Sequence, residues 1–91
     1  MEHLKISDEE VGPRGEELYQ QRLRRLVETP ENIGKHIVID VETGAYEIDE
    51  DGLQATWRLR ARHPGAPLYG ARIGYKAAYS LGGGLEPIRS E

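Results

Sequence analysis

The sequence predicts a small α+β domain whose elements follow the order α-β-β-α-β around a three-stranded sheet. Three observations lead to this class. Residues 14–28 carry apolar side chains at helical spacing, residues 35–49 hold two alternating runs joined through a glycine, and residues 50–62 form a second helical stretch that precedes a third alternating run. The 91 residues are enough for one domain with one modest core.

The first element is a helix over residues 14–28. Tyr19, Leu23, Leu26 and Val27 recur at the spacing of one helical face, and Thr29-Pro30 ends the helix because a residue before proline avoids the α conformation. Residues 1–13, which end in Gly12-Pro13, contain few apolar side chains to offset the entropy lost on ordering. We therefore expect a disordered arm over 1–13 and a folded domain over 14–81.

A β-hairpin follows the first helix. Residues 35–41 are rich in β-branched side chains, and a turn around Gly44 returns the chain as a second strand over 45–49. Alternation assigns the side chains of the first strand to two faces of the sheet. One face holds Ile37, Ile39 and Val41, and the other holds His36, Val38 and Asp40.

The second helix is expected over residues 50–62, and acidic residues 49–51 favour its N-terminus. Its predicted buried stripe consists of Leu53, Thr56, Trp57 and Ala61, widened by Leu59. A third strand is expected over residues 67–75, followed by a short helical turn over 76–81 and a flexible tail over 82–91.

Composition excludes several classes of stabilising site. The chain has no cysteine, so disulfides and the usual cysteine-rich zinc sites are ruled out, and its three histidines are scattered. We predict no metal site and no cofactor. The polar, acidic start is unlike a signal peptide, and no apolar run is long enough to span a bilayer, so we expect a cytoplasmic protein without a membrane partner.

One motif looks catalytic. Residues 39–44 resemble the first motif of the DnaQ-like 3′–5′ exonucleases, in which an Asp and a Glu two residues apart help to hold two metal ions. Asp40 and Glu42 have that spacing, but no aspartate follows Asp51, and the later glutamates lie in the expected tail. We therefore predict that both are strand-end and turn residues, that the chain has no catalytic residues, and that it is not an enzyme.

The charges suggest an alternative function. Residues 1–51 carry 14 acidic and 6 basic side chains, whereas residues 52–91 carry 2 acidic and 6 basic ones. A basic half can face an acidic partner. The candidate nucleic-acid-binding set is Arg58, Arg62, Arg72 and Lys76. The alternative to an interaction module is thus a nucleic-acid-binding regulator.

The predicted sheet needs a cover. One helix packs on one face of three strands, and the other face must be covered by the first helix, by a second copy of the chain or by another protein. Two open strand edges also invite pairing with another chain. We expect a homo-oligomer or a protein partner, with the partner-binding surface on the third strand at Arg72, Ile73, Gly74 and Tyr75.

The combined pattern resembles a group of small uncharacterised bacterial proteins over about three quarters of the chain. The resemblance rests on Gly34-Lys35-x-Ile37-Val38-Ile39-Asp40-x-Glu42-Thr43-Gly44-x-Tyr46-Glu47-Ile48-Asp49 and on Arg72-Ile73-Gly74-Tyr75-x-Ala77-Ala78-Tyr79-x-Leu81-Gly82-Gly83. Genes of this group often accompany one for a retropepsin-like aspartic protease. The resemblance implies a non-catalytic, antitoxin-like or accessory regulatory protein, and such a protease as its partner.

Overall fold

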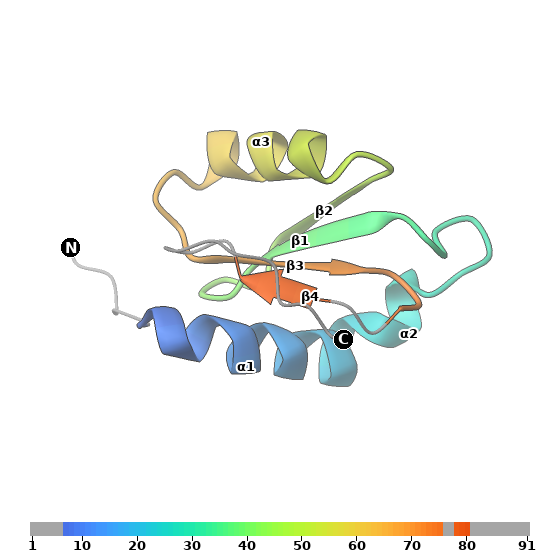
Figure 1. Ribbon diagram of the computed structural model, residues 1–91, viewed down its shortest axis with the longest axis horizontal. Helices are drawn as coiled ribbons and strands as arrows, with labels where there is room; N and C mark the ends of the chain where they lie inside the picture. The colour runs from blue at the N-terminus through green and yellow to red at the C-terminus, as the bar shows by residue number, and fades with distance from the viewer. Residues whose placement is uncertain (1–6, 76–77, 81–91) are drawn as a thin grey trace.

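The computed structural model describes residues 7–75 and 78–80. Its elements in chain order are α1 (Asp8–Leu18), the π-helix η1 (Tyr19–Leu23), α2 (Arg24–Val27), β1 (His36–Asp40), β2 (Tyr46–Asp49), α3 (Gly52–Arg62), β3 (Leu68–Arg72) and β4 (Ala78–Ser80). The predicted α+β class and the order α-β-β-α-β are confirmed, and β4 extends the three expected strands by one (Figure 1).

The sheet has the strand order β2-β1-β3-β4, and every pair of neighbours is antiparallel. The helical turn expected over residues 76–81 is wrong where the structure describes it, because residues 78–80 form β4 beside β3. The reversal is a tight turn after Arg72, in which the N–H of Tyr75 donates to the carbonyl of Arg72 (3.0 Å) and Gly74 adopts φ 85°. A positive φ at the third turn position favours glycine.

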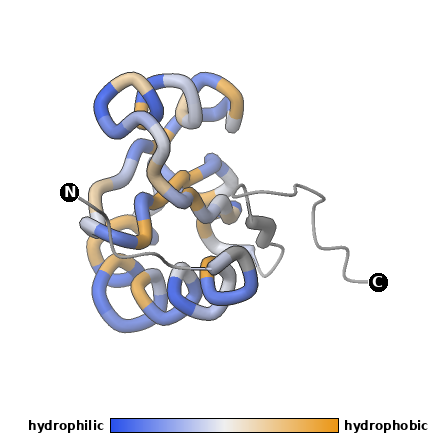
Figure 2. Tube along the Cα trace, turned by 90° about the vertical axis from the view of Figure 1, so that its left-hand side faces the viewer, coloured by the Kyte–Doolittle hydropathy of each residue, from blue (hydrophilic) through white to orange (hydrophobic). Residues whose placement is uncertain are grey.

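Both faces of the sheet are covered by helices of this chain. α3 lies on one face, and α1, η1 and α2 run as one N-terminal helical segment, residues 8–27, across the other (Figures 1 and 2). Of the three covers considered for the open face, the first helix is therefore the one present. The sheet needs no second chain to complete its core.

The N-terminal helical segment begins six residues before the predicted start at Arg14. Asp8 is its first residue, and the backbone N–H of the preceding Ser7 donates to Glu10 Oε1 (3.1 Å). Val11 is completely buried in the core. Its burial helps to offset the ordering entropy that led us to expect a disordered arm, so that prediction is wrong over residues 8–13. Residues 1–6, and the predicted tail over 82–91, lie outside the described residues.

The π-helical turn keeps one stripe of the N-terminal helical segment on the sheet. Its buried residues, Val11, Gly15, Tyr19, Leu23 and Val27, recur at every fourth position. A plain α-helix has about 3.6 residues per turn, so a four-residue repeat drifts around the axis, and a wider π-turn counteracts that drift. Leu26, which we placed on the buried stripe, is instead 65% exposed.

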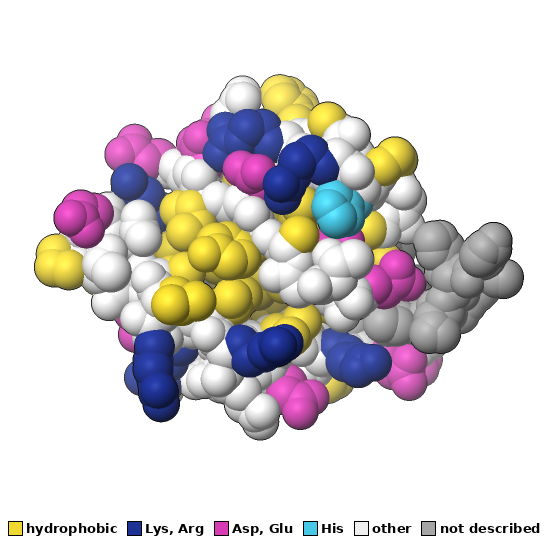
Figure 3. Space-filling model, turned by 180° about the vertical axis from the view of Figure 1, so that it is seen from behind, with side chains coloured by type: hydrophobic (Ala, Val, Ile, Leu, Met, Phe, Trp, Pro, Cys, Tyr) yellow, Lys and Arg dark blue, Asp and Glu magenta, His cyan; other side chains and the backbone are white. Residues whose placement is uncertain are grey.

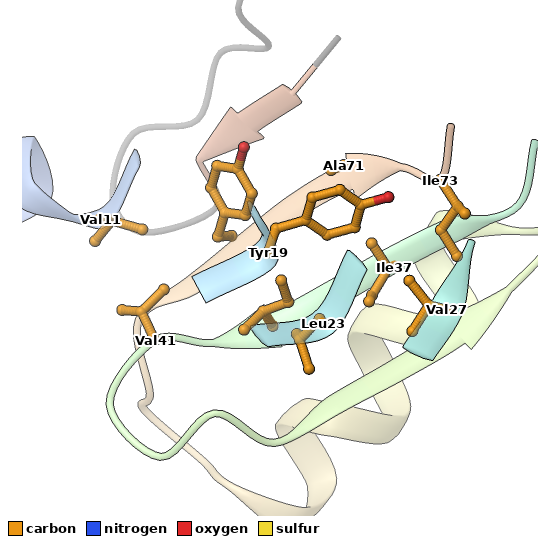
Figure 4. Packing of buried hydrophobic residues seen from close by; sticks show 10 residues of the cluster. Val11, Tyr19, Leu23, Val27, Ile37, Val41, Ala71 and Ile73 are labelled. Atoms are coloured by element: carbon orange, nitrogen blue, oxygen red, sulfur yellow. The ribbon is translucent and has the colours of Figure 1, made fainter. Parts of the chain in front are cut away.

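Two hydrophobic clusters flank the sheet. Ile37 and Ile39 of β1 face the N-terminal helical segment, and Val38 faces α3, as the alternation predicts. Figure 4 shows the larger cluster, in which Tyr19, Leu23 and Val27 pack onto Ile37, Ala71 and Ile73. The smaller cluster joins Ala55 and Leu59 of α3 to Val38 and Leu68.

The predicted buried stripe of α3 is largely wrong. Ala55, Thr56 and Leu59 face the sheet, whereas Leu53, Trp57 and Ala61 are exposed. Both sets of residues have helical spacing, so the apolar pattern alone does not choose between them. In the folded chain, small Ala55 allows close approach to the sheet, and the adjacent face of α3 forms ion pairs with β2.

Candidate functional site

The Asp-x-Glu motif forms a turn, as predicted. Asp40 is 1% exposed, and its Oδ1 accepts hydrogen bonds from the backbone N–H groups of Glu42 (2.9 Å) and Thr43 (3.4 Å). The N–H of Gly44 donates to the backbone carbonyl of Asp40 (2.7 Å), and Gly44 has φ 85°. The described residues contain no group of three or more His, Asp or Glu side chains placed to hold a metal ion.

Asp40 also has a partner that sequence reasoning missed. Its Oδ2 lies 2.8 Å from Nδ1 of His63, the residue that follows α3. The two residues are 23 positions apart, and neither belongs to a local pattern that signals the contact. The pair ties the end of α3 to the end of β1, and Oδ1 meanwhile holds the turn. All of the recorded contacts of this carboxylate are thus structural.

Arg58, a member of the predicted nucleic-acid-binding set, binds β2 instead. Its guanidinium donates to Glu47 Oε1 (2.9 Å), to Asp49 Oδ2 (3.0 Å) and to the carbonyl of Ile48 (3.0 Å). Nη2 of Arg62 lies 3.4 Å from Oε2 of Glu47. The hydrogen bonds to Glu47 and Asp49 raise the pKa of Arg58. The backbone N–H of Asp51 and the Arg58 guanidinium lower the pKa of Asp49.

The rest of that set does not join Arg58. Arg72 donates from Nε to the carbonyl of Gly34 (3.0 Å), and its guanidinium stacks 5.1 Å from the ring centroid of Tyr75. Lys76 lies outside the described residues. The structure therefore brings Arg58 and Arg62 together over acidic side chains of β2, with Arg72 held at a separate turn.

The predicted partner-binding segment, Arg72–Tyr75, is a turn and not the interior of a strand. Ile73 is fully buried, and its backbone exchanges hydrogen bonds with Lys35 (2.8 Å) and Gly34 (2.9 Å). A Cβ on Gly74 would come within 3.0 Å of the Ile33 side chain. Ile73 and Gly74 thus shape the turn, and only Arg72 and Tyr75 present side chains to solvent.

The open edge of β2 has the stronger features of a docking site. The N–H of Asp40 donates to the carbonyl of Ala45 (2.8 Å), which sets the phase of the β1–β2 ladder. Because hydrogen-bonded pairs alternate in antiparallel strands, the backbone groups of Tyr46 and Ile48 point away from β1. Arg58 caps the outward carbonyl of Ile48. No described strand lies beyond β2 on this side.

Apolar and basic side chains border this edge. Tyr46 and Ile48 are half-buried against the larger core cluster, as is Leu18 of α1. An adjacent open pocket of about 260 Å³ is lined by Arg14, Glu17, Leu18, Gln21, Arg22 and Val41. The view from behind shows hydrophobic side chains gathered in the middle of the molecule, with basic side chains above and below (Figure 3). We call Leu18, Tyr46, Ile48, Arg14 and Arg22 the edge surface.

Comparison with protein-family models, with curated proteins and with solved structures finds no match to this chain. The resemblance to small bacterial proteins and to their protease partner therefore stays a prediction. Within the described residues, no helix combines the length and apolar character needed to cross a bilayer.

Proposed function

We propose that this chain is a non-catalytic protein-interaction module that binds an extended segment of another protein along β2. The observation that carries the proposal is the outward-facing backbone of Tyr46 and Ile48, which lies beside the half-buried side chains of the edge surface. A strand added to an open edge gains main-chain hydrogen bonds, and alternate side chains supply specificity. This mode of binding requires no catalytic group in this chain.

The charges of the edge surface favour an acidic segment. Arg14 and Arg22 line the pocket beside Leu18, and neither forms an ion pair with a described residue. Glu17 lines the same pocket, so the two arginines and this glutamate together carry a net charge of +1. A partner strand that carries both apolar and acidic side chains on its face toward the N-terminal helical segment would place the apolar ones beside Tyr46 and Ile48 and the acidic ones within reach of the arginines.

A second copy of β2 fits this edge less well than a different protein does. Antiparallel pairing centred on residue 47 would place Glu47 directly opposite Glu47 of the other copy, and like charges in that position are destabilising. The proposed partner is accordingly a different cytoplasmic protein, with this chain as its accessory or antitoxin-like subunit. A retropepsin-like aspartic protease that offers an exposed acidic strand is the partner suggested by the resemblance.

Nucleic-acid binding is the less favoured alternative. Arg58 and Arg62 already face Glu47 and Asp49, so a phosphate group would have to compete with these carboxylates. Phosphate-driven binding weakens steeply as salt rises. Retention of a mixed DNA and RNA pool at low salt, lost when Arg58 and Arg62 are both changed to Ala, would favour the alternative over the proposal.

The proposal is tested with two labelled peptides of equal length that carry Thr at every second position. Along the other face, one peptide alternates Val and Glu and the other alternates Val and Lys. In fluorescence anisotropy titrations, we expect the acidic peptide to bind more tightly. Changing Arg14 and Arg22 together to Glu should weaken its binding by on the order of tenfold, which corresponds to about 1.4 kcal/mol. Equal binding of both peptides, or none of either, would contradict the proposal.

Tyr46→Pro and Tyr46→Ala form a matched pair for the strand-pairing step. Both remove the phenol ring, but only proline removes the outward N–H, and a proline there leaves the β1 ladder intact. We expect Tyr46→Ala to retain measurable binding and Tyr46→Pro to abolish it, while circular dichroism shows both variants folded. Equal binding by the two variants would show that the backbone edge is not used.

A further inference from the structure

Only part of the β2 edge offers free backbone groups to another strand. Tyr46 and Ile48 direct their N–H and carbonyl groups away from β1, and the carbonyl of Ile48 already accepts from Arg58 (3.0 Å). Of the described residues, none binds the N–H or carbonyl of Tyr46 or the N–H of Ile48. A partner strand gains about three main-chain hydrogen bonds from these groups. So short a ladder needs a second anchor to hold one particular segment.

The pocket of the edge surface lies next to the start of this ladder. Val41, which lines the pocket, directly follows β1, and Tyr46 begins β2 across the same hairpin turn. Arg14 and Arg22 line the pocket from the N-terminal helical segment, and neither forms an ion pair with a described residue. Because guanidinium groups bind carboxylates in a bidentate manner, the pocket is suited to a carboxylate of a partner.

The opposite end of β2 is acidic. Asp49 ends the strand, and Glu50 and Asp51 follow it. The backbone N–H of Asp51 lowers the pKa of Asp49, and so do the neighbouring basic residues Arg58 and Lys35. The three carboxylates outnumber these two basic side chains, whereas basic side chains are in excess at the pocket. The charge along the β2 edge therefore changes from positive beside the pocket to negative at Asp49.

We propose that the segment bound along β2 is the carboxyl-terminal end of the partner protein, antiparallel to β2, with its terminal carboxylate in the pocket. This assignment rests on the proposed function and adds the direction of the segment and the group that anchors it. β2 runs from the pocket toward Asp49, so an antiparallel segment runs toward the pocket and ends there. A parallel segment would place its carboxylate beside Asp49 and Glu50, where like charges repel. Every pair of neighbouring strands in this sheet is antiparallel as well.

The register follows from the outward groups of β2. A residue of the partner segment that lies opposite Tyr46 exchanges both hydrogen bonds with it, and both side chains point toward the N-terminal helical segment. The residue two positions earlier lies opposite Ile48 in the same way. Each further residue advances the chain by about 3.4 Å, so about one or two residues beyond Tyr46 bring the terminal carboxylate to the pocket. We therefore expect a partner segment with two apolar side chains separated by one residue, which ends shortly after the second.

Two labelled peptides test the terminal carboxylate. Both end in Val-Thr-Val-Thr and lack acidic side chains, but one carries a free carboxylate at its end and the other a carboxamide. In anisotropy titrations of the full chain, we expect the free acid to bind about fivefold more tightly. Changing Arg14 and Arg22 together to Gln should remove this difference. Arg25→Glu is the matched control, because it changes the net charge equally at an exposed arginine of the same helical segment that does not line the pocket.

The possible outcomes separate this proposal from the proposed function. Equal binding of the free acid and the amide would overturn it, and so would loss of their difference in Arg25→Glu. The peptide that alternates Val and Glu along one face, made with a carboxamide end, tests the proposed function alone. If that peptide binds while the free acid and the amide do not differ, β2 binds internal acidic strands and only the assignment of the chain end fails. If no peptide binds, both fail.

The direction of the segment is tested by nuclear magnetic resonance with a nitroxide label on the free-acid peptide. A label at the amino end of the peptide should broaden the amide signals of Glu50 and Asp51 more strongly than those of Leu18 and Val41. A label beside its carboxyl end should have the opposite effect, because the antiparallel segment ends at the pocket. The reversed pattern would show parallel binding and would overturn the proposed arrangement.

Discussion

Gly15 of α1 lies directly against the ring of Tyr69 in β3, so closely that a Cβ at position 15 would overlap the Cβ and Cγ atoms of Tyr69. The phenol of Tyr69 then reaches the neighbouring residue, Glu16, and donates to its Oε1 (2.8 Å). Burial and this hydrogen bond both raise the pKa of Tyr69. The absent side chain at position 15 therefore sets the distance between the N-terminal helical segment and the sheet.

Gly15→Ala should destabilise the protein. Alanine gains up to about 1 kcal/mol in helix propensity, but overpacking against Tyr69 costs typically about 1–3 kcal/mol, so the net effect is a loss. Gly12→Ala is the matched control, because a Cβ at position 12 meets nothing within 4 Å. Urea denaturation should show a lower midpoint for Gly15→Ala and an equal or higher one for Gly12→Ala. A gain in stability at both positions would contradict the close approach.

Tyr19 should make stability depend on pH in the alkaline range. Burial, together with the hydrogen bond that its hydroxyl donates to Glu28 Oε2 (2.7 Å), raises the pKa of Tyr19 from about 10 to about 12. Because folding favours the neutral phenol, the contribution is fully present below pH 10 and is lost as pH rises through 12. Chemical denaturation from pH 9 to pH 12 should show this decline.

Tyr19→Phe removes one of two buried phenols with a raised pKa and should make that decline smaller, with the remainder due to Tyr69. It should also lower stability near neutral pH by about 0.5–1.5 kcal/mol, since the hydrogen bond to Glu28 is lost. Tyr75→Phe is the control, because Tyr75 is 57% exposed. If the two variants keep the same alkaline dependence as the wild type, Tyr19 is not its source.

The contact between Asp40 and His63 should stabilise the fold cooperatively. Asp40→Ala removes a buried carboxylate that also holds the turn, and we expect a loss of about 1–3 kcal/mol. His63→Ala removes only the contact between His63 and Oδ2 of Asp40, so it should lower the free energy of unfolding by less than Asp40→Ala does. A double-mutant cycle should give a coupling energy of at least about 0.5 kcal/mol at pH 7. Strict additivity of the two losses would show that the pair contributes nothing of its own.

Arg58 should protect β2 against non-specific pairing. It caps the outward carbonyl of Ile48, and open strand edges promote aggregation. Arg58→Ala should raise light scattering and thioflavin fluorescence on incubation, with little change in the melting temperature. Arg62→Ala removes an ion pair to the same Glu47 but no contact to a strand carbonyl, so it serves as the control. Equal aggregation of both variants would assign the effect to lost charge alone.

The sequence predicts the hairpin well because each feature of the hairpin depends on residues that are close together in the chain. The β-branched run of β1, the Gly44 turn and the capping role of Asp51, whose Oδ1 accepts from the N–H of Leu53 (2.9 Å), are each settled within a few residues. The turn role of Asp40 is predictable for the same reason, because its Oδ1 accepts from backbone N–H groups that lie only two and three positions further along the chain.

The candidate site was predicted only in part. Arg72 and Tyr75 are at the surface as expected, but Ile73 is buried and Gly74 shapes the turn. The edge surface combines residues from α1, η1 and β2, and no spacing along the chain signals that they meet. One signal was present: Tyr46 and Ile48 alternate with two acidic residues, which marks β2 as a strand with one apolar and one charged face.

The amino-acid order alone determined β1, β2, β3 and the greater part of both long helices, because helical and strand periodicity are properties of neighbouring residues, but it did not determine the first turn of α1 or β4. The tertiary structure decided which arc of α3 is buried, which helix covers the second face of the sheet and where Arg58 and His63 find their partners. The apolar pattern of α3 is compatible with two different buried faces, and only packing against the sheet selects one of them. Contacts with β1 bury Ala55 and Leu59, and the ion pair to Glu47 of β2 holds Arg58. Leu53 and Trp57 consequently face outward.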